Sequence, residues 1–236
     1  MSFSDLLAVV PARGGSQGIP GKNLRHAGGM SLVARAAEFA TALPCVGAAV
    51  ISSDDPAIIA EAQSHGLDAP FVRPAELATG TALAVDTWRH AWLACEAHYG
   101  RRFDVSLFLE PTSPLREPDD VAAVLAALEA PGILAATTVS AVPAHFAPPK
   151  VFRRDAEGVL VPSVEDPESV SIRQKLDPYF RRNGLCYAAR RDAIVELRSI
   201  VGTRCAGVVI DRDVVNIDLP DELALADRLL HQEDTA

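Results

Sequence analysis

The residues best suited to chemistry lie in one short segment near the amino terminus, residues 11–23, which reads PARGGSQGIPGKN. It contains four glycines and the two cations Arg13 and Lys22. Glycine lets backbone N–H groups approach an anion closely, because no Cβ blocks the way. Arginine and lysine add positive charge where phosphate oxygens would lie. The segment therefore predicts a polyphosphate-binding loop.

The spacing in this loop differs from two common phosphate loops. A dinucleotide-binding loop needs G-x-G-x-x-G running into a helix, whereas the spacing from Gly15 is G-x-x-G-x-x-G and Pro20 interrupts any early helix. A Walker loop needs a hydroxyl residue after Gly-Lys, and Asn23 follows Lys22. Both differences disfavour those classes, including an NAD-dependent dehydrogenase.

Three further segments carry polar groups after apolar runs: SSDD at 52–55, EPTSPLR at 110–116 and NIDLPDE at 216–222. Rigid loops at strand ends are good places to hold a ligand. Each also has a structural interpretation. Asp54 or Asp55 would cap a helix, two prolines would fix a connection, and Asp218 would either hold Mg²⁺ or cap the last helix. Residues 216 and 218 would share a face if a strand continued through them.

Arginines and an asparagine also gather late in the chain, at 173–174 and 181–184. Arginine suits bidentate binding of carboxylate or phosphate, and Asn183 can donate and accept at once. For Arg181 and Arg182, a solvated basic face is the plainer interpretation.

The elements that must position these groups alternate between strands and helices. Strands are expected at residues 6–10, 48–52, 105–109, 133–139, 185–188 and 208–217, and helices at 31–43, 56–64, 83–98, 119–129 and 221–231. This repetition predicts an α/β fold with a mostly parallel sheet and helices on both faces. Residues 143–182 break the pattern with six prolines and a hairpin signal around residues 153–158. We expect an inserted arm or lid there, between the two parts of one domain, 1–142 and 183–236.

Composition narrows the class of protein. The 236 residues suffice for one large domain, and the net charge of −9 argues against a nucleic-acid partner. The four cysteines show no C-x-x-C spacing and suit buried free thiols. No leader or long apolar run is present, so we expect a cytoplasmic location without membrane contact.

Taken together, the chain resembles the acylneuraminate cytidylyltransferases, the CMP-sialic acid synthetase family with its relatives for other nonulosonic acids. Residues 11–23 resemble that family's P-A-R-x-G-S-K-G-x-x-x-K-N signature. The segments RPAELA at 73–78, PTSPLR at 111–116, Arg173-Gln174 with Asn183-Gly184, and Ile217-Asp218 match in order. The resemblance covers nearly the whole chain.

The resemblance implies a nucleotide-diphospho-sugar transferase-like fold with a small dimerisation arm, and hence a homodimer. It implies that a sugar acid attacks the α-phosphate of CTP and that pyrophosphate leaves, with Mg²⁺ bridging phosphates. The catalytic residues would be Arg13, Lys22 and Asp218, and the metal ligands Asp218 and Asn216. The nucleotide would meet Ala12, Gly14, Gly15, Ser16, Asn23, Ser53, Asp54 and Arg73. The sugar would meet Glu110, Thr112, Ser113, Arg116, Arg173, Gln174, Asn183 and, across the subunit interface, Lys150.

Some positions depart from the family pattern. Gln17 replaces a lysine, and Glu110 replaces a glutamine, which places a carboxylate toward an anionic sugar. Gly80 and Ala84 stand where an aspartate and a serine are common, near the base. Asn216 replaces the first aspartate of D-I-D, which removes a hard anionic ligand. Two alternatives follow: the same chemistry with another nucleotide such as GTP, or a non-catalytic nucleotide or sugar-nucleotide sensor.

Overall fold

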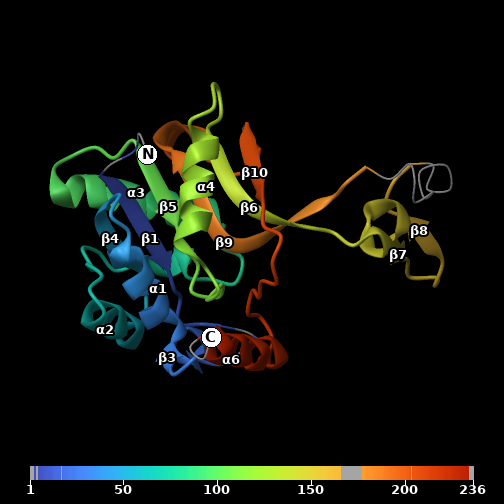
Figure 1. Cartoon of the computed structure of the whole chain (residues 1–236), viewed down its shortest axis with the longest axis horizontal. Helices are drawn as coiled ribbons and strands as arrows, with labels where there is room; N and C mark the ends of the chain where they lie inside the picture. The colour runs from blue at the N-terminus through green and yellow to red at the C-terminus, as the bar shows by residue number, and fades with distance from the viewer. Residues whose placement is uncertain (1–2, 4, 17, 166–176, 203, 234–236) are drawn as a thin grey trace.

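A six-stranded sheet forms the centre of the protein (Figure 1). The computed structural model describes residues 3, 5–16, 18–165, 177–202 and 204–233. The strand order is β10-β6-β9-β5-β1-β4. The strands are β1 (Leu6–Pro11), β4 (Val46–Ser52), β5 (Val105–Phe108), β6 (Ala135–Ala141), β9 (Phe180–Arg190) and β10 (Cys205–Val209).

The sheet is parallel except for β9, which is antiparallel to both β5 and β6. Strand β9 begins where the chain returns from the arm, and Phe180 at its start pairs with Ala141 at the end of β6. Because Ala141 and Phe180 pair at the base of the arm, the chain that leaves along β6 returns along β9 in the opposite direction. The mostly parallel sheet expected from the sequence is confirmed.

Helices cover both faces of this sheet. One core cluster joins α1 (Leu32–Ala42), α2 (Pro56–Ser64) and α4 (Pro118–Leu128) to Leu6, Ala8 and Val10 of β1. The other joins α3 (Ala84–Tyr99) and the π-helix η6 (Asp192–Glu196) to Leu7 and Val9. Successive β1 side chains thus enter opposite cores, as strand geometry requires, and the run is apolar throughout because both faces are buried.

Local sequence signals explain where the helices begin. The Ser31 hydroxyl accepts from the Ala34 amide at the start of α1. The Asp55 carboxylate accepts from Ala57 and Ile58 at the start of α2, with Pro56 in the first turn. The expected Asp-Pro helix start is confirmed, and Asp55 is the capping residue.

The remaining elements are short, apart from the last helix, and connect the layers. A two-stranded ribbon pairs β2 (His26–Ala27) with β3 (Met30–Ser31), and α6 (Pro220–Glu233) packs near it. The 3₁₀ turns are η1 (Lys22–Leu24), η2 (Ala75–Leu77), η3 (Ala144–Phe146) and η4 (Pro148–Lys150).

The expected strand at 208–217 is wrong beyond Val209, where β10 ends. Strand β10 pairs only with β6, and the last contact joins the Ile210 amide to the Val139 carbonyl. Beyond that point β6 leaves for the arm, so the later residues have no strand to pair with. The chain instead returns to the sheet's centre, where the Ile217 amide donates to the Thr112 carbonyl.

The arm projects away from the sheet between β6 and β9 (Figure 1). It carries η3, η4 and an antiparallel hairpin of β7 (Phe152–Arg154) and β8 (Leu160–Pro162). The hairpin expected from the sequence is confirmed. Asp155 closes its turn by accepting from the Glu157 and Val159 amides.

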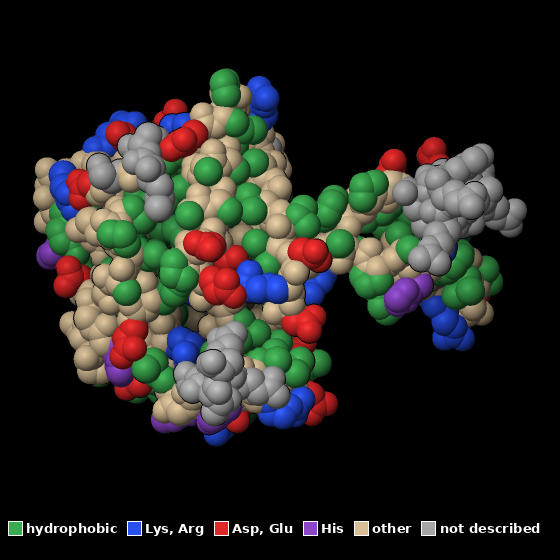
Figure 2. Space-filling model, in the orientation of Figure 1, with side chains coloured by type: hydrophobic (Ala, Val, Ile, Leu, Met, Phe, Trp, Pro, Cys, Tyr) green, Lys and Arg blue, Asp and Glu red, His purple; other side chains and the backbone are tan. Residues whose placement is uncertain are grey.

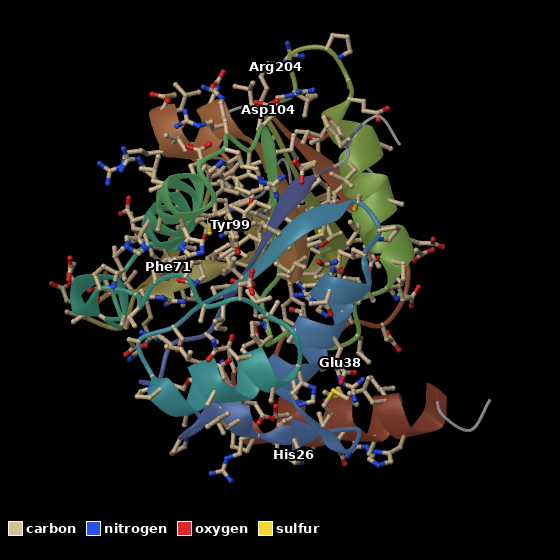
Figure 3. All side chains as sticks on the ribbon, turned by 90° about the vertical axis from the view of Figure 1, so that its left-hand side faces the viewer. His26, Glu38, Phe71, Tyr99, Asp104 and Arg204 are labelled. Atoms are coloured by element: carbon tan, nitrogen blue, oxygen red, sulfur yellow. The ribbon has the colours of Figure 1, made fainter. Side chains whose placement is uncertain are left out.

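Strand direction identifies the end of the sheet where a ligand would bind. Figure 3 shows Asp104 and Arg204, which directly precede β5 and β10, together at the top edge, and His26 at the opposite end. The same view labels Tyr99, the last residue of α3, and places Glu38 of α1 toward the His26 end. The carboxyl ends of the parallel strands therefore point toward the region of the glycine loop, where ligands of open α/β sheets bind.

Candidate functional site

A cavity of about 550 Å³ opens at the carboxyl ends of β1 and β5. Its walls come from the glycine loop, from the loop after β5, from the segment joining η2 to α3, and from the residues just before α6. The predicted site residues that line it are Arg13, Ser16, Lys22, Asn23, Arg73, Glu110, Thr112 and Asp218.

The glycine loop is held in place by its own polar contacts. The Gly14 amide donates to the Asp54 carboxylate at 3.0 Å, and the Asn23 side chain donates to the Arg13 carbonyl at 3.0 Å. The Arg13 guanidinium donates to the Thr79 carbonyl at 2.6 Å. Gly14 and Asp54, which we expected at the nucleotide, therefore fix the loop in this structure. Arg13 and Ser16 face the cavity.

Gly18 lines the cavity, although the sequence reasoning did not select it. A Cβ on Gly18 would lie 2.2 Å from the Asp218 carbonyl oxygen, far inside van der Waals contact. Only glycine lets the loop pack against the segment that carries Asp218. The glycine spacing was the available signal, but its partner is 200 residues away in the chain.

Lys22 joins the glycine loop to that same segment. Its ammonium donates to the Ile217 carbonyl at 2.7 Å and to the Asp218 carboxylate at 2.8 Å. The Lys22 side chain is 13% exposed and that of Asp218 is 73% exposed, so the pair lies at the cavity rim. An ammonium has three donors, which leaves one for a bound anion. Asp218 does not cap α6. Glu222 accepts from the Asp218 and Leu219 amides instead.

Arg73 is a buried cation in the cavity wall. Its guanidinium donates to the Ser52 hydroxyl at 3.1 Å and to the Ser52 carbonyl. Burial lowers its pKa to about 10, while nearby Asp54 raises the pKa and Arg13 lowers it. Arg73 therefore stays charged at neutral pH. Ser53 is fully buried, and its hydroxyl accepts from the Asp55 amide, so it supports this wall without lining the cavity.

The loop after β5 contains residues that line the cavity and residues that are buried and hold the loop in place. Glu110 and Thr112 line the cavity, whereas Ser113 and Arg116 are buried beneath it. The Arg116 guanidinium donates to the Leu185 carbonyl and, at 2.8 Å, to the Glu110 carbonyl. Burial lowers the pKa of Arg116. Arg116, which we expected at the sugar, thus ties the loop to β9.

Asn183 also supports the site from within. It is fully buried, its oxygen accepts from the Thr138 hydroxyl at 2.6 Å, and its amide donates to the Ser140 hydroxyl at 3.1 Å. Both partners belong to β6, so the carboxamide joins β9 to β6 and lines neither cavity at this site.

A second cavity of about 430 Å³ adjoins the first and shares part of its wall. Ala84, Phe108 and Glu110 line both cavities. Its other lining residues include Arg182, for which a solvated basic face was the plainer interpretation from the sequence, and Tyr187 and Ile200, which the sequence did not single out. Asn216 lines this second cavity and Asp218 the first, so the expected pair on one strand face is separated.

Glu110 lies where the two cavities meet. Burial raises the pKa of its carboxyl group. Arg116, Arg182 and Lys22 act in the opposite direction, and Asp218 adds to the increase. Among the described residues, none forms a hydrogen bond or an ion pair with this carboxylate.

Several predicted residues lie elsewhere. Ala12 is buried and donates its amide to the Ser52 carbonyl, and Gly15 is exposed outside the cavity lining. Lys150 ends η4 on the arm. Arg173 and Gln174 lie outside the described residues. Within the described ranges, no three His, Cys, Asp or Glu side chains gather closely enough to hold a metal ion.

Comparison with known proteins places this site in a family. A family model described as cytidylyltransferase matches residues 7–203. The chain belongs to the cytidylyltransferase family. This cytidylyltransferase is 30% identical over 227 residues to CMP-N,N'-diacetyllegionaminic acid synthase of Legionella pneumophila, covering 95% of this chain and 96% of that protein. It is 26% identical over 221 residues to the Campylobacter jejuni synthase of the same name, covering 94% and 92%.

Solved structures agree on the fold of the cytidylyltransferase. A CMP:2-keto-3-deoxy-manno-octonic acid synthetase complexed with CTP superimposes with a TM-score of 0.71 at 21% identity, over 98% of this chain and 100% of that one. A 4-diphosphocytidyl-2C-methyl-D-erythritol synthase from Anaerococcus prevotii gives 0.64 at 11% identity, over 97% and 99%. No helix in the described part of the chain is long and apolar enough to cross a membrane. Cys45, Cys95 and Cys186 are buried free thiols, as expected, and Cys205 is partly exposed.

Proposed function

We propose that this cytidylyltransferase makes the CMP ester of a nonulosonic acid of the legionaminic type. The observation that carries the proposal is the joined pair of cavities: one is lined by Arg13, Lys22 and Arg73, and the other by Arg182. Three cations in the first suit a triphosphate, and one arginine in the second suits a single carboxylate. Two relatives that span almost the whole chain are CMP-N,N'-diacetyllegionaminic acid synthases.

The geometry gives the residues distinct roles in this reaction. Arg13 and Lys22 would neutralise the triphosphate as charge builds on the leaving pyrophosphate, which is the main task of a protein in such a transfer. Arg73, fixed to Ser52, would hold the nucleotide beside them. The sugar's anomeric hydroxyl would enter from the second cavity and reach the α-phosphate near Glu110, which lines both.

Mg²⁺ is part of the proposal, with Asp218 as its protein ligand. Magnesium is commonly bound through one or two carboxylates together with phosphate oxygens of the substrate. The exposed Asp218 carboxylate, at the cavity rim and paired through one oxygen with Lys22, fits that donor set. When bound, the ion would neutralise phosphate charge. Asn216 belongs to the second cavity, so we do not place it on the metal.

The arm supports a proposed homodimer. It exposes the apolar side chains Phe146, Phe152, Val159 and Leu160, and Figure 2 shows hydrophobic groups over its surface away from the sheet. Apolar surface of this kind on a projecting hairpin marks an association site. Light scattering of purified protein should show a dimer, and Phe152→Asp with Leu160→Asp should shift it toward monomer. A monomeric wild-type protein would contradict the proposal.

The proposed reaction is tested by pyrophosphate release. Enzyme, Mg²⁺ and CTP are mixed in turn with N,N'-diacetyllegionaminic acid, pseudaminic acid, N-acetylneuraminic acid and 3-deoxy-manno-octulosonate. We expect the fastest turnover with the first, and with CTP rather than GTP. Thermal-shift titration with CTP and GTP checks the base separately, because the preferred nucleotide stabilises the fold more at equal concentration. Equal rates with GTP, or no turnover with any acid, would contradict the proposal.

A further inference from the structure

We propose that Glu110 is the catalytic base of this enzyme, and that it takes the proton from the sugar hydroxyl that attacks the nucleotide. The inference deepens the proposed function and rests on it. It starts from the position of Glu110, the one carboxylate among the described residues that lines both the cation-rich cavity and its neighbour. A group that removes this proton must stand where the two substrates meet.

The other side chains in the two cavity walls that could accept a proton are either already ion-paired or unsuited to the role. No histidine of the described residues lines either cavity. Asp218, the second carboxylate, is ion-paired with Lys22 at 2.8 Å. Tyr187 lines only the second cavity, and burial raises its pKa, so its hydroxyl keeps its proton. Glu110 is the remaining acceptor in these walls.

The backbone around Glu110 holds the carboxylate in place while leaving it open. The Glu110 carbonyl accepts from the Arg116 guanidinium at 2.8 Å and from the Ser113 amide at 3.2 Å, and Pro111 stiffens the next bond. Its carboxylate has no hydrogen-bond partner among the described residues. An ionised carboxylate can only accept hydrogen bonds, so this group is available to accept from a hydroxyl of a bound sugar.

Burial and the neighbouring cations act on the pKa of Glu110 in opposite directions. Lys22 of η1, Arg116 of the loop after β5, and Arg182 of β9 favour its ionised form, whereas burial and Asp218 favour its protonated form. Burial dominates and raises the pKa above the ordinary glutamate value. A base is most effective when its pKa approaches the working pH.

The proposed step moves one proton and transfers one cytidylyl group. The anomeric O–H bond breaks and its proton passes to the Glu110 carboxylate. The oxygen forms a bond to the α-phosphorus of CTP, and the bond to the β-phosphate oxygen breaks. Pyrophosphate leaves with that electron pair. The protonated Glu110 then returns its proton to water after the product departs.

The test is the pH profile of the chemical step in Glu110→Gln, which keeps the shape of the side chain and removes the base. Single-turnover rates are measured from pH 5 to 9 with CTP and N,N'-diacetyllegionaminic acid. In the wild type we expect a rate that falls as the pH decreases through the pKa of Glu110. In Glu110→Gln we expect a rate about 10²-fold lower at pH 8, with that acidic limb absent. The KM for CTP should change less than threefold.

Two variants keep the test decisive. Arg181→Gln changes an exposed side chain of β9 that lines neither cavity and should behave as the wild type. Glu110→Asp keeps a carboxylate but shortens the side chain by one methylene. Its rate should be lower than that of the wild type, and its pH profile should keep the acidic limb. If Glu110→Gln shows no thermal shift with CTP, that variant no longer binds the nucleotide. The pH profile of Glu110→Asp then decides whether Glu110 is the base. A wild-type rate in Glu110→Gln, or a lower rate with the acidic limb retained, would overturn the inference. An inactive wild type would instead contradict the proposed function.

Discussion

Replacing Lys22 with methionine should separate the catalytic role of this residue from its structural role. Lys22→Met keeps a long, unbranched side chain at this position. It removes the ammonium that contacts the Ile217 carbonyl and the Asp218 carboxylate. The Asp218 partner is 73% exposed, so the ion pair contributes about 0.2–1 kcal/mol to folding. The bond to Ile217 adds about 1 kcal/mol.

The two effects differ in size. A loss of about 1–2 kcal/mol should lower Tm by about 2–8 °C for a chain of this size. In the proposed reaction the same ammonium would face the phosphates on which negative charge grows. Removing a donor of that kind typically lowers kcat by about 10²–10³, which is about 2.7–4 kcal/mol of transition-state stabilisation.

Pyrophosphate release at saturating CTP and sugar acid gives kcat, and thermal melting gives Tm. The matched control is Arg25→Met, a cation three residues after Lys22 that donates to the Pro20 carbonyl at 3.1 Å but does not line the cavity. It should leave kcat within twofold. Equal kcat values for Lys22→Met and Arg25→Met would refute the assignment of the phosphate loop, whatever their melting temperatures.

Three further predictions follow from single contacts. Gly18→Ala should abolish activity and weaken CTP binding in thermal shift, because its Cβ would stand 2.2 Å from the Asp218 carbonyl; full activity would show that the loop packs otherwise. Asn183→Ala should lower stability to urea by about 2–4 kcal/mol, because it leaves the Thr138 and Ser140 hydroxyls without their buried partner; a loss under 0.5 kcal/mol would contradict this. Glu110→Gln should melt above the wild type at pH 8, with the difference vanishing near pH 4. The raised pKa means that the folded state binds this proton more tightly than the unfolded state, so wild-type stability falls as the pH increases above the unfolded value; a difference independent of pH would contradict it.

The glycine loop and its supporting strand could be predicted because their signals are local. Strand β1 follows from an apolar run buried on both faces, and the start of α2 follows from Asp55 and Pro56. Arg13 and Lys22 line the cavity as their positions in the loop suggested.

The division between ligand-facing and supporting residues could not be predicted in the same way. Three residues carry polar groups that could bind a ligand: Ser113, Arg116 and Asn183. In the structure each uses them in buried hydrogen bonds with residues distant in sequence. Polar type and loop position are the same for both roles, and only the tertiary fold decides which way a side chain turns. Arg182 shows the reverse case, since it was interpreted as a solvated face and lines the second cavity.

The prediction of where β10 ends was wrong for a related reason. Residues 208–217 are apolar enough for a strand, but a strand also needs a partner, and β6 departs into the arm after Ala141. The expected common face for Asn216 and Asp218 disappeared with it. The dimer, the domain boundaries, the cytoplasmic location and Mg²⁺ stay predictions.

The most direct test of the proposed reaction follows the phosphorus atoms of CTP into the products. The enzyme is incubated with N,N'-diacetyllegionaminic acid, Mg²⁺ and CTP labelled at either the α- or the γ-phosphate, and the products are separated by anion exchange. The proposed reaction carries the α-label into a CMP–sugar ester, whereas the γ-label is released only as pyrophosphate. Recovery of the α-label as free CMP or unreacted CTP, or of the γ-label on the sugar, would contradict it.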